Sequence, residues 1–229
     1  MKKTIDSKEL ILEVLKEKSS LKQDVYHNTF KQFEVFKQKA KLLAETIHKE
    51  VAEIDKRVEV SYKEVSKYEF QLQVAADVLV FSMHTNVFQF DQSQNVWKTS
   101  YLKENPLRSF CGIIYIYNFL ADSLRFNRMN DMGYLIARVI INSEDHFLVQ
   151  GKRQLAFLYN DFIDTQLNED KVAEIIKSAI LYSLDFDLLI PPYDQQKEVS
   201  VGEMKEMSES NFVRTAKRMG FKFDADSSD

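Results

Sequence analysis

GYLIARVIINSEDHFLVQGKRQL, residues 133–155, decides the fold of this chain. Two apolar runs of strand length flank the polar sequence NSED, a pattern that predicts a β-hairpin with a tight turn. If Asn142 lies opposite Asp145, Arg138 lies opposite Val149 and both faces of the hairpin are apolar. We therefore expect a hairpin covered on both sides, with Arg138 as the one charge within it.

Arg138 has two interpretations. A guanidinium left unpaired in an apolar setting costs several kcal/mol, so it needs a partner. An internal carboxylate such as Asp77 or Asp131, or a stem that carries the charge to the edge of the sheet, would make Arg138 structural. A bound anion would instead make Arg138 a ligand-binding residue.

The chain before the hairpin predicts more strands. In residues 68–74, apolar positions alternate with Glu69, Gln71 and Gln73, which indicates a strand with one buried and one wet face. We expect further strands at 77–83, 86–91 and 96–102, joined by short turns and hence antiparallel. Residues 106–125 are ambiguous: their ends favour helix, while the β-branched and aromatic centre, IIYIYNF, is also compatible with a buried strand.

A long helix is predicted within residues 7–57, which contain no glycine or proline. Apolar residues repeat there at helical spacing and form one stripe. The stripe either covers the protein's own sheet or pairs with the same helix of a second subunit in a homodimer. The candidate interface residues are Phe33, Phe36, Ala40, Leu43, Ile47 and Ile54.

Two helices are expected after the hairpin, near residues 155–163 and 172–184, the second ended by Pro191-Pro192. Residues 193–229 are polar and include a short amphipathic helix at 210–220. That helix could dock into the groove of a protein partner or fold back on its own domain.

These elements predict an α+β fold, in which an antiparallel sheet (meander plus hairpin) is flanked by helices and preceded by the long amphipathic helix. We divide the chain into an N-terminal helical segment (1–57), an antiparallel α+β domain (58–192) and a polar tail (193–229). The order of strands, helix and hairpin is loosely similar to PAS-like or profilin-like scaffolds.

Composition narrows the function classes. The chain has 229 residues, 45% of them hydrophobic, and 31 basic against 35 acidic residues give a net charge of −4. This balance argues against a dedicated nucleic-acid binder. No apolar run is long enough for a membrane helix, and the N-terminal sequence does not resemble a signal peptide, so we expect a cytoplasmic protein. The lone Cys111 excludes an internal disulfide.

Basic residues supply the remaining candidate ligand-binding positions. Lys152 and Arg153 follow Gly151 between a strand and an expected helix, where they could hold a phosphate or form a solvated turn. Arg125 and Arg128 alternate with Phe126 and asparagines, as in a patch that stacks on bases, or lie in a loop clamped by Asp122 and Asp131.

The sequence contains no motif for metal binding or nucleophilic catalysis, so we assign no catalytic residue, metal ligand or cofactor. The leading hypothesis is a non-catalytic intracellular module that binds a ligand or a partner and dimerises through its long helix. The alternative is an enzyme acting on nucleotides or nucleic acid, with Arg138, Lys152 and Arg153 holding phosphate.

Overall fold

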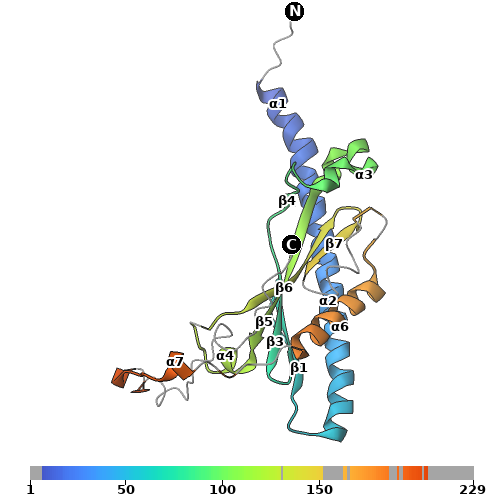
Figure 1. The fold of residues 1–229 in the computed structure, drawn as a ribbon. Coiled ribbons are helices and arrows are strands. Elements are labelled where there is room, and N and C mark those ends of the chain that lie inside the picture. Colours follow the sequence, from blue (N-terminus) through green and yellow to red (C-terminus); the bar gives the residue numbers. More distant parts are fainter. Residues whose placement is uncertain are drawn as a thin grey trace, which may run out of the picture.

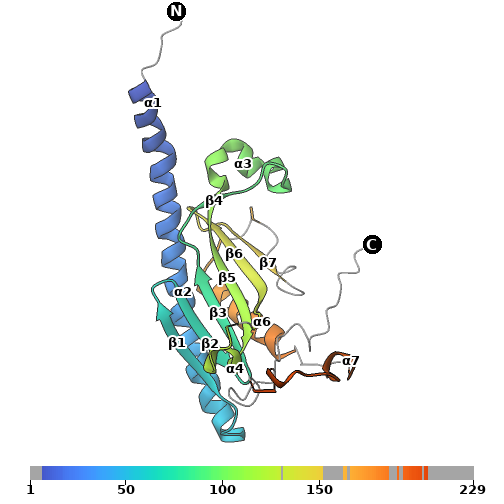
Figure 2. The same cartoon turned by 90° about the vertical axis from the view of Figure 1, so that its left-hand side faces the viewer.

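The computed structural model describes residues 7–129, 131–151, 162–163, 166–185, 190, 193–202 and 204–205. It opens with the predicted long helix, formed without a break by α1 (Ser7–Val14), the π-helical segment η1 (Leu15–Ser19) and α2 (Ser20–Ile54). Figures 1 and 2 both show α1 projecting beyond the sheet. The absence of glycine and proline allows this length, since neither helix breaker interrupts the hydrogen-bond ladder.

The strands of the described residues form one seven-stranded antiparallel sheet, which confirms the predicted α+β class. Its order is β1-β2-β3-β5-β6-β7, and β4 pairs with β5 beside this path. The strands are β1 (Val60–Ser66), β2 (Glu69–Val74), β3 (Asp77–Met83), β4 (Phe88–Gln89), β5 (Phe110–Leu120), β6 (Tyr134–Asn142) and β7 (Phe147–Gly151).

The main core lies between the sheet and two helices on one of its faces, α2 and α6 (Glu169–Leu184). Asn168 caps the start of α6: its side-chain oxygen accepts a hydrogen bond from Lys171 N at 2.9 Å. The helix then follows the predicted apolar stripe. Along β2, buried residues alternate with partly exposed ones, as the sequence predicts. We refer to the opposite side of the sheet, which carries Gln71 and Gln73, as the far face.

One end of the far face is covered by a lobe built from residues 88–109. The lobe contains η2 (Asn95–Lys98), α3 (Ser100–Glu104) and η3 (Pro106–Ser109). The predicted strand at 96–102 is therefore wrong, and the predicted strand at 86–91 shrinks to β4. The reason is packing: Tyr101 and Leu102 turn together into a second core on the far face, and the Thr99 side chain caps the helix that carries them.

The ambiguous segment 106–125 combines three elements. Asn105 caps the 3-10 turn η3, residues 110–120 form β5, and the chain then enters α4 (Ala121–Arg125). The centre is a strand because both of its faces are covered at one end, by α2 on one side and the lobe on the other. A strand buried on both faces shows no period-two pattern, which explains the ambiguity of its sequence.

The hairpin forms where predicted, but its register is shifted by one residue. Asn142 N donates to His146 O at 3.0 Å, so the turn has three residues instead of two, and Asp145 adopts a positive φ of 62°. Arg138 consequently lies opposite Gln150, and Val149 opposite Val139. This shift moves Val149 to the main core and places the Gln150 amide beside Arg138 on the far face.

The helical stripe covers the protein's own sheet. Phe33, Phe36 and Ala40 are fully buried in the main core, so they cannot also form an interface with a second copy. Leu43 and Ile47 pack partly against the same core. Ile54, in contrast, is 84% exposed at the end of α2. The intramolecular interpretation therefore holds for all but the last residue of the stripe.

Most of the chain after β7 is described only in part. α6 confirms the helix expected at 172–184, and it ends at Leu184, ahead of the two prolines. The short helix α7 (Tyr193–Gln196) follows in the tail. The helix expected near 155–163, apart from residues 162–163, and the amphipathic helix expected at 210–220 lie outside the described residues. Within the described part, no helix has both the length and the apolarity needed to cross a membrane.

Candidate functional site

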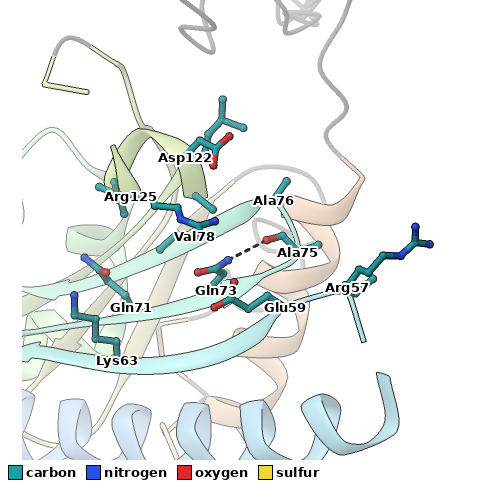
Figure 3. Close-up of a pocket in the computed structure, with 14 residues that line it drawn as sticks. Arg57, Glu59, Lys63, Gln71, Gln73, Ala75, Ala76, Val78, Asp122 and Arg125 are labelled. Atoms are coloured by element: carbon teal, nitrogen blue, oxygen red, sulfur yellow. Dashed lines mark hydrogen bonds between the residues drawn. The ribbon is translucent and has the colours of Figure 1, made fainter. Parts of the chain in front are cut away.

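A groove of about 690 Å³ lies on the far face, at the end that the lobe leaves uncovered. Strands β1, β2 and β3 form its floor, and α4 forms a wall above them (Figure 3). The volume falls within the range of about 300–1,000 Å³ that small-molecule sites occupy. Its polar lining residues are Arg57, Glu59, Lys63, Gln71, Gln73, Asp122 and Arg125.

The pairing of the strands fixes the positions of the floor residues. Lys63 and Gln71 are direct cross-strand partners, as are Gln73 and Val78, so these side chains lie in adjacent rows. Arg125 descends from α4 and lies above Val78 in Figure 3. An ammonium group, amides and a guanidinium therefore line one groove together with the apolar Val78, a mixture that is typical of sites that orient a polar ligand.

The charged groups of the groove do not neutralise one another. Among the described residues, no ion pair or side-chain hydrogen bond involves Lys63 or Arg125, nor the carboxylates of Glu59 and Asp122. Arg57 differs, because its guanidinium pairs with Asp55 at 2.7 Å and turns away from the groove in Figure 3. Four charged side chains thus remain available to a ligand.

A tight turn closes one end of the groove. Ala75 and Ala76 connect β2 to β3, and Ala75 adopts a φ of 54°, a conformation that favours glycine. The turn is held by Ala75 N donating to Glu59 O and by Ala121 N donating to Ala76 O, both at 2.8 Å. These two bonds join the residue before β1, the turn and α4 into one frame around the groove.

The structure separates the predicted ligand-binding arginines. Arg125 lines the groove, whereas Arg138 lies on β6 and is not among its lining residues. Arg138 is half-buried, and its Nε donates to Gln150 Oε1 at 2.6 Å. Of the interpretations given above, an internal carboxylate such as Asp77 or Asp131 was one; the observed partner is a neutral amide that the shifted register brings opposite. The guanidinium therefore lies beside a polar neighbour instead of within an apolar ribbon.

Arg128 has a structural position. It is 8% exposed, its Nη1 lies 3.9 Å from Asp131 Oδ2, and Ser123 Oγ donates to the same carboxylate oxygen at 2.6 Å. Of the two aspartates predicted to hold this loop, Asp131 is therefore confirmed as a neighbour of Arg128. Asp122 instead lines the groove. Lys152 and Arg153 lie outside the described residues, so their role in binding phosphate stays a prediction.

A second polar cluster surrounds the turn between β6 and β7. Tyr101 Oη donates to Glu144 Oε2 at 2.8 Å, and Arg108 Nε donates to the other oxygen of that carboxylate at 3.1 Å. On the opposite side, the amides of Asn28 and Gln32 donate to Asp145 Oδ1 at 2.9 and 2.7 Å. Because these bonds join the turn to the lobe and to α2, the cluster acts as a latch for the hairpin.

The pKa shifts within this latch agree with a structural role. Burial raises the pKa of Tyr101 to about 12, and the nearby Glu144 carboxylate adds to the rise against an opposing hydrogen bond from Asn142. Burial works to raise the pKa of Glu144 too, but the hydrogen bonds from Tyr101 and Arg108 outweigh it and the pKa is lowered. At neutral pH both groups thus keep the protonation states that their mutual bond requires.

Sequence reasoning missed Glu59, Lys63, Gln71, Gln73 and Asp122 as site residues. The wet face of β2 was visible in its alternation, but β1 was not predicted as a strand, although Val58, Val60 and Tyr62 alternate with polar residues. Without β1 and the pairing of Lys63 with Gln71, no sequence signal brings these positions together.

Comparison with known proteins gives no further guide to this site: no family model matches the chain, and neither a curated protein nor a solved structure matches it significantly. The likeness to PAS-like or profilin-like scaffolds stays a prediction. Among the described residues, no three or more histidine, cysteine, aspartate or glutamate side chains are close enough to hold a metal ion.

Proposed function

We propose that this chain is a non-catalytic binding module that takes a small polar ligand in the groove between the sheet and α4. The observation that carries the proposal is the convergence of charged and amide side chains from β1, β2 and α4 on one hollow of about 690 Å³. Such groups fix a ligand by hydrogen bonds and charge, while Val78 and Leu124 supply apolar contact.

Thermal denaturation with defined probes tests this proposal. We expect at least one of citrate, AMP or triglycine to raise the melting temperature in a concentration-dependent manner, because a ligand that binds only the folded state stabilises it. Gln73→Trp fills the groove from its floor and abolishes the rise. Val65→Trp, an exposed site on β1 that does not line the groove, is the matched control and keeps it. The proposal fails if no probe stabilises the protein, or if both variants respond like the wild type.

The proposal also includes self-association through the long helix. We propose that the contact with a second copy is made by the first turns of this helix, α1 and η1. Leu10, Ile11, Val14 and Leu15 are each about half exposed, and neither α1 nor η1 has a buried residue. A projecting helix with exposed apolar side chains supports contact with a second copy.

Light scattering at increasing protein concentration tests the association. We expect a dimer that Ile11→Asp converts to a monomer, whereas Ile54→Asp, at the other exposed end of the same helix, leaves it intact. A wild-type monomer at several hundred micromolar would contradict the proposed self-association.

The enzyme alternative rests on Arg138, Lys152 and Arg153 sharing a cleft; Arg138 does not line the groove, and the other two lie outside the described residues.

A further inference from the structure

Arg138 lies on the far face in a row of residues that does not belong to the groove. Its direct cross-strand partners are Tyr115 on β5 and Gln150 on β7, and Tyr115 in turn lies opposite Ser82 on β3. Figure 2 shows β5, β6 and β7 side by side in the sheet. Val78, which lines the groove, is four residues along β3 from Ser82, a distance of roughly 13 Å. A ligand at Arg138 would therefore lie outside the groove.

The Arg138 guanidinium has no counter-charge among the described residues. Its Nε donates to the neutral Gln150 Oε1 at 2.6 Å, and it forms no ion pair there. Glu69 ends the same row of the sheet, but three strand spacings separate its Cα from that of Arg138, which is roughly 14 Å. A half-buried cation with only a neutral partner is costly, and an anion bound from outside would offset that cost.

Hydrogen-bond donors without an acceptor surround this guanidinium. The two terminal nitrogens of Arg138, the Tyr115 hydroxyl and the Gln150 Nε2 form no hydrogen bond within the described part of the chain. Each of these atoms is accessible to solvent. Tyr117 adds a second hydroxyl of the same kind, and its ring stacks on that of Tyr115 with the centroids 5.9 Å apart. Donors from β5, β6 and β7 thus occupy one patch of the far face.

We infer that the Arg138 guanidinium, with the hydroxyls of Tyr115 and Tyr117, binds the phosphate group of a small phosphomonoester. With Nε bonded to Gln150, both terminal nitrogens of Arg138 remain for two oxygens of one anion, the bidentate arrangement that guanidinium groups form with phosphate. The hydroxyls and the Gln150 amide can donate to the third phosphate oxygen, which a carboxylate lacks. The Tyr117 ring, on the side toward the groove, offers apolar contact to the organic part of the ester.

Isothermal titration of the full chain with ribose 5-phosphate, inorganic phosphate and acetate tests the inference. We expect ribose 5-phosphate to bind more tightly than inorganic phosphate, because only the ester has an organic part. Acetate, with two oxygens and one charge, should bind about tenfold or more weakly than ribose 5-phosphate. Arg138→Gln should weaken the binding of ribose 5-phosphate about tenfold or more, since it removes the charge-assisted contacts. Lys49→Gln, at an exposed lysine of α2, removes the same charge as a control and should leave the affinity unchanged.

Two further variants test the site with little change to the packing of the sheet. Tyr115→Phe and Tyr117→Phe each remove one hydroxyl and keep the ring, and each should weaken the binding of ribose 5-phosphate about threefold. Thermal denaturation without ligand separates binding from a structural role of the arginine. Arg138→Gln should melt no lower than the wild type, because it removes a half-buried cation that lacks a counter-charge among the described residues.

The inference is overturned if ribose 5-phosphate does not bind at millimolar concentration, or if Arg138→Gln and both tyrosine variants keep the wild-type affinity. Equal affinities for ribose 5-phosphate and inorganic phosphate would show that the ester is the wrong ligand, and equal affinities for ribose 5-phosphate and acetate that phosphate is the wrong group. Binding that Arg125→Gln weakens and Arg138→Gln does not would place the phosphate in the groove and also overturn the inference. None of these results would contradict the proposed function of the groove, because the two sites lie apart.

Discussion

Gly112→Ala is expected to destabilise the protein strongly, because α2 lies directly against β5 at this glycine. A Cβ atom at residue 112 would lie 2.1 Å from Thr29 Oγ1 and 2.7 Å from Thr29 Cβ. Rotating the threonine side chain would remove only the first clash, since its Cβ does not move, and would break the bond from Oγ1 to Val25 O. The helix must therefore move away from the sheet along a row that includes the buried Phe33 and Phe36.

Overpacking of this kind costs about 1–3 kcal/mol and occasionally more. We expect about 3 kcal/mol for Gly112→Ala, which corresponds to a melting temperature lower by roughly 6–12 °C for a chain of this size. Urea denaturation followed by circular dichroism measures the free energy of unfolding directly.

Thr29→Gly supplies the rescue, because it removes every atom that the new Cβ would meet. The single variant loses helix propensity and buried contacts. In the double variant, the two costs should be less than additive by about 2 kcal/mol, which a double-mutant cycle resolves. Strict additivity, or a Gly112→Ala variant within about 0.5 kcal/mol of the wild type, would refute the close approach of α2 to β5.

Two further stability predictions concern the turns. Ala75→Gly should raise the free energy of unfolding by about 0.5–1 kcal/mol, because it relieves the positive φ of the β2–β3 turn. Ala76→Gly, at a position without positive φ, should lower the free energy of unfolding instead, and equal effects of the two variants in urea denaturation would contradict this prediction. Glu144→Gln should flatten the dependence of stability on pH. The pKa of Glu144 is lowered in the folded state, so its contribution to the free energy of unfolding is fully present above the unfolded pKa of about 4.3 and is lost as pH falls through the folded pKa. Urea denaturation at pH 6 and pH 3 checks this prediction, because the free energies of unfolding of wild type and variant should converge at the lower pH.

The main elements of the fold were predictable because their sequence patterns are periodic. The α2 stripe through Phe33, Phe36 and Ala40 has helical spacing, and β2 alternates strictly, so both were assigned from local pattern alone. The strand prediction for residues 96–102 was wrong because apolar residues in a short helix that packs on a second core resemble those of a strand. Tertiary packing determined the secondary structure of that segment, and a local sequence pattern carries no information about such packing.

The candidate site was less predictable for two physical reasons. The hairpin register depended on Asp145 adopting a positive φ, and the resulting extra turn residue replaced Val149 by Gln150 opposite Arg138. The groove depends on β1, which was not predicted and which pairs Lys63 with Gln71, and on α4 folding over β3, which joins residues remote in sequence. Arg125 was identified as a candidate, but its neighbours emerge only from these pairings.

The most direct test of the binding groove is a two-dimensional ¹H–¹⁵N NMR titration of the full chain with triglycine, citrate and AMP in turn. We predict that the side-chain amide signals of Gln71 and Gln73 and the backbone signals of Lys63 and Arg125 shift together and saturate with one affinity. Shifts confined to other surfaces, such as the turn at Asn142–His146, with the groove signals unmoved by all three probes, would contradict the account.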